Sequence, residues 1–236
     1  MARRRIYPQN DTASTGGEPG HTPLERARII QTALRLLNES GFKELSMRKI
    51  ADALGVKTAS LYYHVKDKDQ LLQLLADTLS DQMAEPDPAL PWREQLVQWS
   101  GAFLTALRGC RDAPDIFQAT IAMGYGRLTQ IERLFHILAA AGFRDEHIPW
   151  MASILKNYVI GFAADEARLK ALTGPEDGGM EQRDGSYTEA YRSLPEDRFP
   201  NMIRLAVYTT RPNGDEEFQF GLEALMDGFE AKAGKV

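Results

Sequence analysis

Residues 58–64 carry the side chains best suited to contacting a polar partner. Helical spacing turns Leu61 and Val65 inward and leaves small, hydroxyl and aromatic groups outside: Thr58, Ala59, Ser60, Tyr62, Tyr63 and His64. Few ordinary surface helices expose two tyrosines beside small residues. A helix that enters the major groove of DNA uses such groups to contact bases and phosphates. The segment is therefore a candidate recognition helix.

A preceding helix and a tight turn would hold this segment in place. Ser46 can accept a hydrogen bond as an N-cap, and apolar residues then recur at three- and four-residue spacing: Met47, Ile50, Ala51 and Leu54. Gly55 supplies the left-handed conformation that ends a helix. Thr58 is expected to cap the second helix, residues 59–64. This spacing is that of a helix-turn-helix.

The next helix begins almost at once. Asp67 and Gln70 form a capping box, and leucines continue the pattern to about residue 84. Only Val65 and Lys66 separate this helix from the candidate recognition helix. Any tilt of the longer helix must therefore move the recognition helix. This coupling would allow a conformational switch to act on DNA binding.

Enzyme signatures are missing from the sequence. The four histidines show no metal-ligand spacing, and neither a G-x-S-x-G motif nor a P-loop is present. Gly124 and Gly126 do not make a dinucleotide motif, because Thr129 stands where the third glycine belongs. We predict no catalytic residue, no metal site and no cofactor.

The composition indicates a cytoplasmic globular protein. The 236 residues are 43% hydrophobic, which is enough to form one or two cores. A single cysteine, Cys110, excludes an intramolecular disulfide and suits a reducing compartment, as either a structural thiol or a redox sensor. We predict no membrane span, because the most apolar stretch, 151–164, is broken by Lys156 and Asn157. The basic N-terminus also lacks the apolar run of a signal peptide.

The charge is unevenly spread along the chain. Residues 1–84 carry 12 Lys and Arg against 10 Asp and Glu, a net charge of +2. Residues 85–236 carry 16 against 23, a net charge of −7. The basic part contains the helix-turn-helix, and an acidic remainder would limit non-specific binding to DNA.

The helical patterns predict an all-α fold in several parts. Residues 1–22 are expected to form a disordered basic arm, 23–66 the helix-turn-helix domain, 67–85 a connecting helix and 91–236 a larger helical domain. Within the larger domain we expect a short helix at 115–123 and longer helices at 146–172 and 216–232. Aromatic residues recur there with two polar ones, and the set fits an apolar small-molecule cavity: Trp99, Phe103, Phe117, Thr120, Tyr125, Trp150, Asn157 and Tyr158.

A long stretch around the helix-turn-helix resembles the DNA-binding domain of the TetR family of bacterial transcriptional repressors. The resemblance is carried by the Gly-Phe at residue 41, Ser-Met-Arg-Lys-Ile-Ala from residue 46, Leu-Gly-Val from residue 54 and Leu-Tyr-Tyr-His-Val-Lys-Asp-Lys from residue 61. It implies binding of operator DNA through Arg48, Lys57, Thr58, Ala59, Ser60, Tyr62, Tyr63, His64 and Lys68. Base reading is assigned to Arg48, Thr58 and Ser60, while the others position the helix.

The C-terminal end resembles the same family's tetracycline-repressor-like branch. Residues 218–230 are similar to the last helix of that branch, and Trp92 matches the tryptophan that opens its first core-domain helix. The resemblance implies a C-terminal domain for ligand binding and dimerisation, in which helices 146–172 and 216–232 form a homodimer interface. Small residues there would allow close approach: Gly161, Ala163, Ala164, Gly221, Ala224 and Gly228.

One departure from that branch affects the expected effector. Aligned from Trp92, Phe117 occupies the position of the histidine that binds the drug's magnesium ion, and Trp99 replaces a pocket asparagine. A further family histidine falls at Met83 or Ala84, and only Phe103 and Thr120 are kept. Phenylalanine cannot bind Mg²⁺, so a more aromatic or apolar effector than magnesium-tetracycline is predicted.

The sequence thus predicts a homodimeric repressor that binds a palindromic operator and is released by a small molecule. Two alternatives stay open. One is a transcriptional activator, or a DNA-binding protein that answers a protein partner and has a closed core. The other is a helical carrier or enzyme, against which the missing catalytic constellation counts.

Overall fold

The computed structural model describes residues 25–173, 187–210 and 214–233, and every regular element in these ranges is helical, as predicted. Residues 187–192 are helical too. The predicted basic arm at 1–22 lies outside the described residues. The remaining elements, in chain order, are α1 (Arg26–Ser40), η1 (Phe42–Glu44), α2 (Met47–Leu54), α3 (Thr58–His64), α4 (Lys68–Asp81), α5 (Trp92–Arg108), α6 (Ala113–Ala119), α7 (Tyr125–Ala140), α8 (Ile148–Thr173), α10 (Pro200–Thr210) and α11 (Gly214–Ala233).

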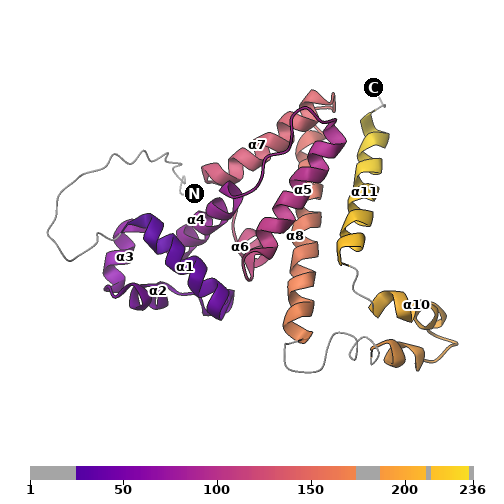
Figure 1. Ribbon diagram of the computed structural model, residues 1–236, viewed down its shortest axis with the longest axis horizontal. Coiled ribbons are helices and arrows are strands. Elements are labelled where there is room, and N and C mark those ends of the chain that lie inside the picture. The colour runs from indigo at the N-terminus through magenta and orange to yellow at the C-terminus, as the bar shows by residue number, and fades with distance from the viewer. Residues whose placement is uncertain (1–24, 174–186, 211–213, 234–236) are drawn as a thin grey trace, which may run out of the picture.

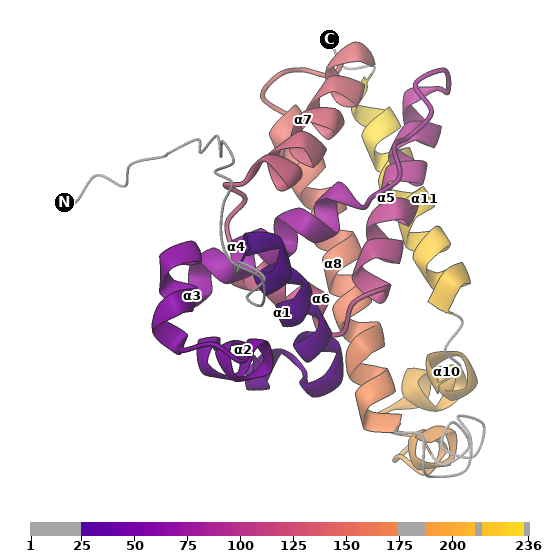
Figure 2. The ribbon, with the colours of Figure 1, turned by 60° about the vertical axis from the view of Figure 1, so that its left-hand side comes forward.

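The helix α4 joins two groups of helices. The first three helices form a compact group at one end, and α5, α7 and α8 form the larger group (Figure 1). The long helix α8 and the last helix α11 lie side by side in both views (Figures 1 and 2). One continuous set of buried apolar side chains runs from α1 to α11.

Local capping defines the helix-turn-helix. The hydroxyl of Ser46 accepts the N–H of Lys49 at 3.3 Å, and Gly55 ends α2 with φ of 69°. The prediction that Thr58 caps the following helix is wrong. Lys57 takes the N-cap position without a side-chain bond, and its carbonyl accepts the N–H of Ser60 at 2.9 Å.

Two reciprocal hydrogen bonds start α4, as the capping box predicts. Asp67 accepts the N–H of Gln70 at 2.7 Å, and the Gln70 side chain accepts the N–H of Lys66 at 2.6 Å. The helix ends at Asp81, three residues before the predicted end. It makes its most extensive contact with α7, so it lies against the larger domain along its C-terminal half.

The short helix α6 is displaced from its predicted range of 115–123. Pro114 falls in its first turn, where a missing N–H costs nothing, so the helix begins at Ala113. Its end comes early because Thr120 is extended. The Arg127 guanidinium donates to both the carbonyl and the hydroxyl oxygen of Thr120, at 3.3 and 2.7 Å.

The turn between α5 and α6 forms a second connection between the two helix groups. The N–H of Arg111 donates to the Asn38 side chain at 2.7 Å, and its guanidinium donates to the carbonyl of Glu39 at 3.2 Å. Asp112, with a positive φ of 55°, accepts the N–H of Phe42 at 2.8 Å. We call this contact of Arg111 and Asp112 with the end of α1 the interdomain strap.

Candidate DNA-binding surface and ligand cavity

The outward face of α3 is open to a partner. Tyr62 is 51% exposed and Tyr63 is 90% exposed, whereas Leu61 and Val65 are fully buried beneath them. The other residues assigned to DNA are all exposed or half-buried: Arg48, Lys57, Thr58, Ala59, Ser60, His64 and Lys68. The face of α3 therefore presents hydroxyl and aromatic groups, and the assigned cations come from α2, the turn before α3 and the start of α4.

Two cations near α3 have partners of their own. The Lys68 ammonium lies 5.3 Å from the centre of the Phe42 ring, which orients it beside the start of α4. The Arg26 guanidinium donates to the carbonyl of His64 at 3.4 Å. A cation at the C-terminal end of a helix is favourable for the helix dipole, so Arg26 stabilises α3 from outside.

Three of the predicted ligand residues meet in the larger domain. Trp99 and Phe103 of α5 have ring centres 5.2 Å apart, and Phe103 lies 5.1 Å from Phe117 of α6. They border a cavity of about 30 Å³, the room of a water molecule. We call it the aromatic cavity, and its lining is Ser80, Met83, Trp99, Phe103, Phe117, Arg127, Gln130, Ile131 and Lys156.

The other predicted ligand residues lie elsewhere. Thr120 sits at the edge, where its hydroxyl bonds with Arg127. Tyr125 and Trp150 are 73% and 62% exposed, and Asn157 is exposed as well. Tyr158 turns toward α11, where its hydroxyl donates to the carbonyl of Phe218 at 2.8 Å. The structure therefore does not gather these aromatics around one cavity.

The polar lining of the aromatic cavity was missed from the sequence. Gln130 is buried, donates to the carbonyl of Ser80 at 3.0 Å and accepts the indole N–H of Trp99 at 3.1 Å. Arg127, only 7% exposed, places its guanidinium 5.1 Å from the centre of the Phe117 ring. The sequence did contain a signal for this lining. Arg127 and Gln130 are three residues apart and share a helix face with Leu134, which is apolar.

Burial sets the ionisation of this region. It lowers the pKa of Arg127, and the nearby Asp77 carboxylate offsets the effect only in part. Burial, and then the charge of Arg127, lowers the pKa of Lys156. Burial also raises the pKa of Asp77, against the hydrogen bond that it accepts from Arg127.

The start of α7 is capped by a residue of α4. The N-cap of α7 is Gly124, which has no side chain, and the Asp77 carboxylate accepts the N–H of Arg127 at 3.0 Å instead. A β-carbon on Gly126 would lie 2.6 Å from the carbonyl oxygen of Asp77. The two helices therefore touch backbone to backbone, and a carboxylate at a helix N-terminus is favourable for the dipole.

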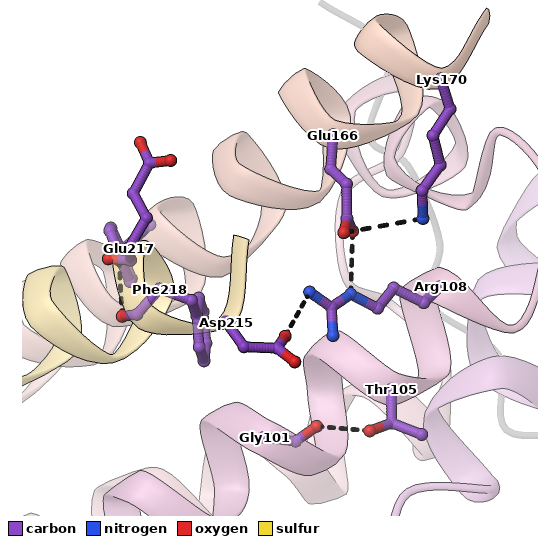
Figure 3. Close-up of polar contacts among 9 residues, drawn as sticks. Gly101, Thr105, Arg108, Glu166, Lys170, Asp215, Glu217 and Phe218 are labelled. Atoms are coloured by element: carbon purple, nitrogen blue, oxygen red, sulfur yellow. Dashed lines mark hydrogen bonds and ion pairs between the residues drawn. The ribbon is translucent and has the colours of Figure 1, made fainter. Parts of the chain in front are cut away.

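A group of ion pairs attaches the last helix to the larger domain. Arg108 of α5 pairs with Glu166 of α8 at 2.8 Å and with Asp215 of α11 at 2.9 Å (Figure 3). Lys170 approaches the same Glu166 carboxylate at 3.6 Å. These charges join three helices at the end where α11 begins.

A larger groove of about 330 Å³ lies between α4 and α5. Uncharged residues, most of them small, line it: Leu79, Gln82, Ala84, Ala102, Thr105, Ala106 and Gly109. None of the predicted ligand residues borders this groove. Its larger volume would favour this groove as the effector site. The aromatic cavity, however, has the convergent polar groups that fix a ligand's orientation.

Residues 29–75 match the profile of the bacterial regulatory proteins of the tetR family, and residues 85–233 match the tetracyclin repressor-like C-terminal domain. The chain belongs to the TetR family. This TetR-family regulator is 28% identical to the tetracycline repressor protein class C of Escherichia coli, over 88% of this chain and 91% of that one. Over 145 residues, 61% of each chain, it is 31% identical to an HTH-type transcriptional regulator of Saccharopolyspora erythraea.

The fold is shared with solved TetR-family structures. The TetR family protein ActR of Streptomyces coelicolor, in complex with actinorhodin, superposes with a TM-score of 0.82 at 30% identity, over 91% of this chain and 99% of that one. The resemblance expected from the sequence is thereby confirmed, as are the helix-turn-helix and the role in transcription regulation. In the described part of this TetR-family regulator, no helix is long and apolar enough to cross a membrane, and no group of three His, Cys, Asp or Glu could hold a metal ion.

Proposed function

We propose that this TetR-family regulator is a homodimeric repressor that binds a palindromic operator and is released by an aromatic or apolar small molecule other than magnesium-tetracycline. The observation that carries the proposal is the course of α4. Its first residue follows α3 after a three-residue link, and its C-terminal half supplies Ser80 to the lining of the aromatic cavity. A change in the cavity therefore reaches the recognition helix through one rigid element.

The exposed face of α3 supports operator binding. Two such helices in a dimer reach successive major grooves when they lie about 34–36 Å apart. A ligand that displaces α4 changes this separation, so that both helices no longer fit their half-sites. Ligand and operator affinities must then oppose each other by the same factor.

The surfaces of α8 and α11 support dimerisation. A β-carbon on Gly161 or Gly228 would meet nothing within 4 Å, and Phe220 is 76% exposed in the single chain. Gly221 differs, because a β-carbon there would lie 2.2 Å from the Tyr158 hydroxyl. We assign Gly161 and Gly228 to the interface between protomers and Gly221 to packing inside one protomer.

The absence of a magnesium ligand supports the predicted effector class. Phe117 is buried against Phe103 and carries no ligand atom. At this position the effector would meet an aromatic ring instead of a metal ion. Ring stacking against buried aromatics favours a flat, unsaturated molecule.

The small volume of the aromatic cavity favours a second candidate. At about 30 Å³ the cavity is far below the roughly 300 Å³ or more that a drug-sized ligand occupies. A protein with so small a cavity between these rings could answer a protein partner instead. In the repressor, the effector must open the cavity by moving Arg127 and Gln130.

A gel-shift titration tests both candidates. DNA from the region upstream of the protein's own gene is titrated across salt concentrations, with and without a panel of aromatic compounds and magnesium-tetracycline. Specific retention that an aromatic compound abolishes is the expected result. Retention that no compound disturbs would favour the partner-regulated candidate, and no retention at low salt would refute both. Light scattering on the same samples should give the mass of a dimer.

A further inference from the structure

Two cationic side chains line the aromatic cavity, and no carboxylate does. Arg127 comes from α7 and Lys156 from α8, so the two charges approach from different helices. They are close enough that the charge of Arg127 affects the ionisation of Lys156. The rest of the lining is three aromatic rings, two aliphatic side chains and the neutral polar residues Ser80 and Gln130, which is an unfavourable place for two like charges.

The hydrogen bonds of Arg127 leave most of its guanidinium unmatched. One terminal nitrogen donates to Thr120, through both the carbonyl and the hydroxyl oxygen. The nearest carboxylate, Asp77, accepts the backbone N–H of Arg127 and not its guanidinium. A guanidinium has five donors arranged as a planar fork. Over the described residues, the remaining donors of Arg127 have no carboxylate partner.

Lys156 has no ion pair within the described part of the chain either. It is half-buried on α8, and the charge that lowers its pKa, after burial, is that of the cation Arg127. The acids close to this region are Asp77 and Asp81 on α4, and neither belongs to the cavity lining. The two cations therefore face the cavity without a counterion in its wall.

We propose that the effector is an aromatic carboxylic acid, whose carboxylate binds between Arg127 and Lys156 while its rings lie in the aromatic cavity. This inference rests on the proposed function, because it takes the aromatic cavity as the effector site. A carboxylate matches the planar fork of a guanidinium and adds charge-assisted hydrogen bonds. A neutral ligand could accept a hydrogen bond from either cation but would bring no countercharge, and a cationic ligand would add repulsion.

The position of Arg127 joins this ligand class to the switch. Its guanidinium faces the cavity, while its backbone N–H is the group that Asp77 of α4 holds. A ligand carboxylate that draws the guanidinium away from Thr120 acts on the first turn of α7, where α4 is attached. The acid group is thus both the anchor of the ligand and the part that moves α4.

Matched pairs of compounds test the charge directly. The probes are 2-naphthoate with 2-naphthamide, and anthraquinone-2-carboxylate with its amide, which differ in charge but little in size. Binding is followed by calorimetry and by quenching of Trp fluorescence, since Trp99 lines the cavity. The variants are Lys156→Gln and Arg127→Gln, with Lys170→Gln as a control for the same change on α8, away from the cavity.

We expect the wild type to bind at least one acid about tenfold or more tightly than its amide, as a charge-assisted hydrogen bond predicts. Lys156→Gln should remove most of that preference and leave the amide unaffected, while Lys170→Gln should keep it. Arg127→Gln should also remove the preference for the acid, provided that the variant folds. If it does not fold, the result for Lys156→Gln decides the test. Equal binding of acid and amide, or binding of neither member of any pair, overturns the inference. The same wild-type sample is also tested for operator binding in a gel shift. If it binds the operator but shows no preference for an acid, the inference about the effector fails while the proposal of a DNA-binding regulator stands.

Discussion

Gly126→Ala is the sharpest test of the contact between α4 and α7. A β-carbon at this position would stand 2.6 Å from the carbonyl oxygen of Asp77 and 3.1 Å from its carbonyl carbon. These are backbone atoms, which cannot rotate away as a side chain can. The substitution therefore has to push α4 and α7 apart.

The size of the effect follows from that geometry. Overpacking of this kind costs about 1–3 kcal/mol, and the helix preference of alanine over glycine returns at most about 1 kcal/mol. We expect a net loss of roughly 1–2 kcal/mol, which lowers Tm by about 2–8 °C in a chain of this length. Because α4 is displaced, operator affinity should fall as well.

Gly101→Ala is the matched control. A β-carbon at Gly101, in the middle of α5, would meet nothing within 4 Å. Alanine should therefore stabilise the protein by about 0.5–1 kcal/mol, an increase in Tm of about 1–4 °C. Thermal unfolding followed by circular dichroism measures both variants. A Gly126→Ala protein that melts at or above the wild type would show that the helices are not in backbone contact.

Three further predictions concern single side chains. Tyr62→Ala should weaken operator binding about tenfold or more, through loss of a hydrogen bond to a charged phosphate, with an unchanged circular dichroism spectrum; unchanged affinity in a gel shift would contradict its assignment to DNA. Asp112→Ala should destabilise the protein by about 1–2 kcal/mol in urea unfolding, because the N–H of Phe42 loses its acceptor, and a wild-type midpoint would show that the strap contributes nothing. Burial, and then the charge of Asp112, raises the pKa of the Cys110 thiol to about 11, so the thiol stays protonated at pH 8. Iodoacetamide should therefore label the native protein much more slowly than the urea-unfolded one, and equal rates would refute this ionisation.

The parts that sequence reasoning predicted well are set by neighbouring residues. Ser46, Gly55 and Asp67 mark helix ends because their side chains or backbone conformations act within one turn. The inward positions of Leu61 and Val65 follow from helical spacing alone. Thr58 shows the limit of such reasoning. The turn after α2 is one residue shorter than expected, so Lys57 and not Thr58 occupies the N-cap position.

The cavity could be predicted only in part, because its members come from five helices. Trp99, Phe103 and Phe117 point inward, as an aromatic set suggests, but Tyr125 and Trp150 lie on the outer faces of their helices. An aromatic type does not reveal which face of a helix it occupies. A charged residue type likewise does not indicate that the side chain is buried. Arg127 and Lys156 were therefore assigned to no site from the sequence.

The interdomain strap limits how the DNA-binding helices can move. A rigid body held at one point can turn about three axes, but a body held at two points can turn only about the line that joins them. The first three helices are joined to the start of α4 through the short link after α3, and Arg111 and Asp112 hold them at the end of α1 and the start of η1. Two such attachments favour rotation of these helices about the line that joins them over other movements. The walls of the cavity could change to suit a new ligand while the direction of that rotation, and with it the reading of the operator, stays the same.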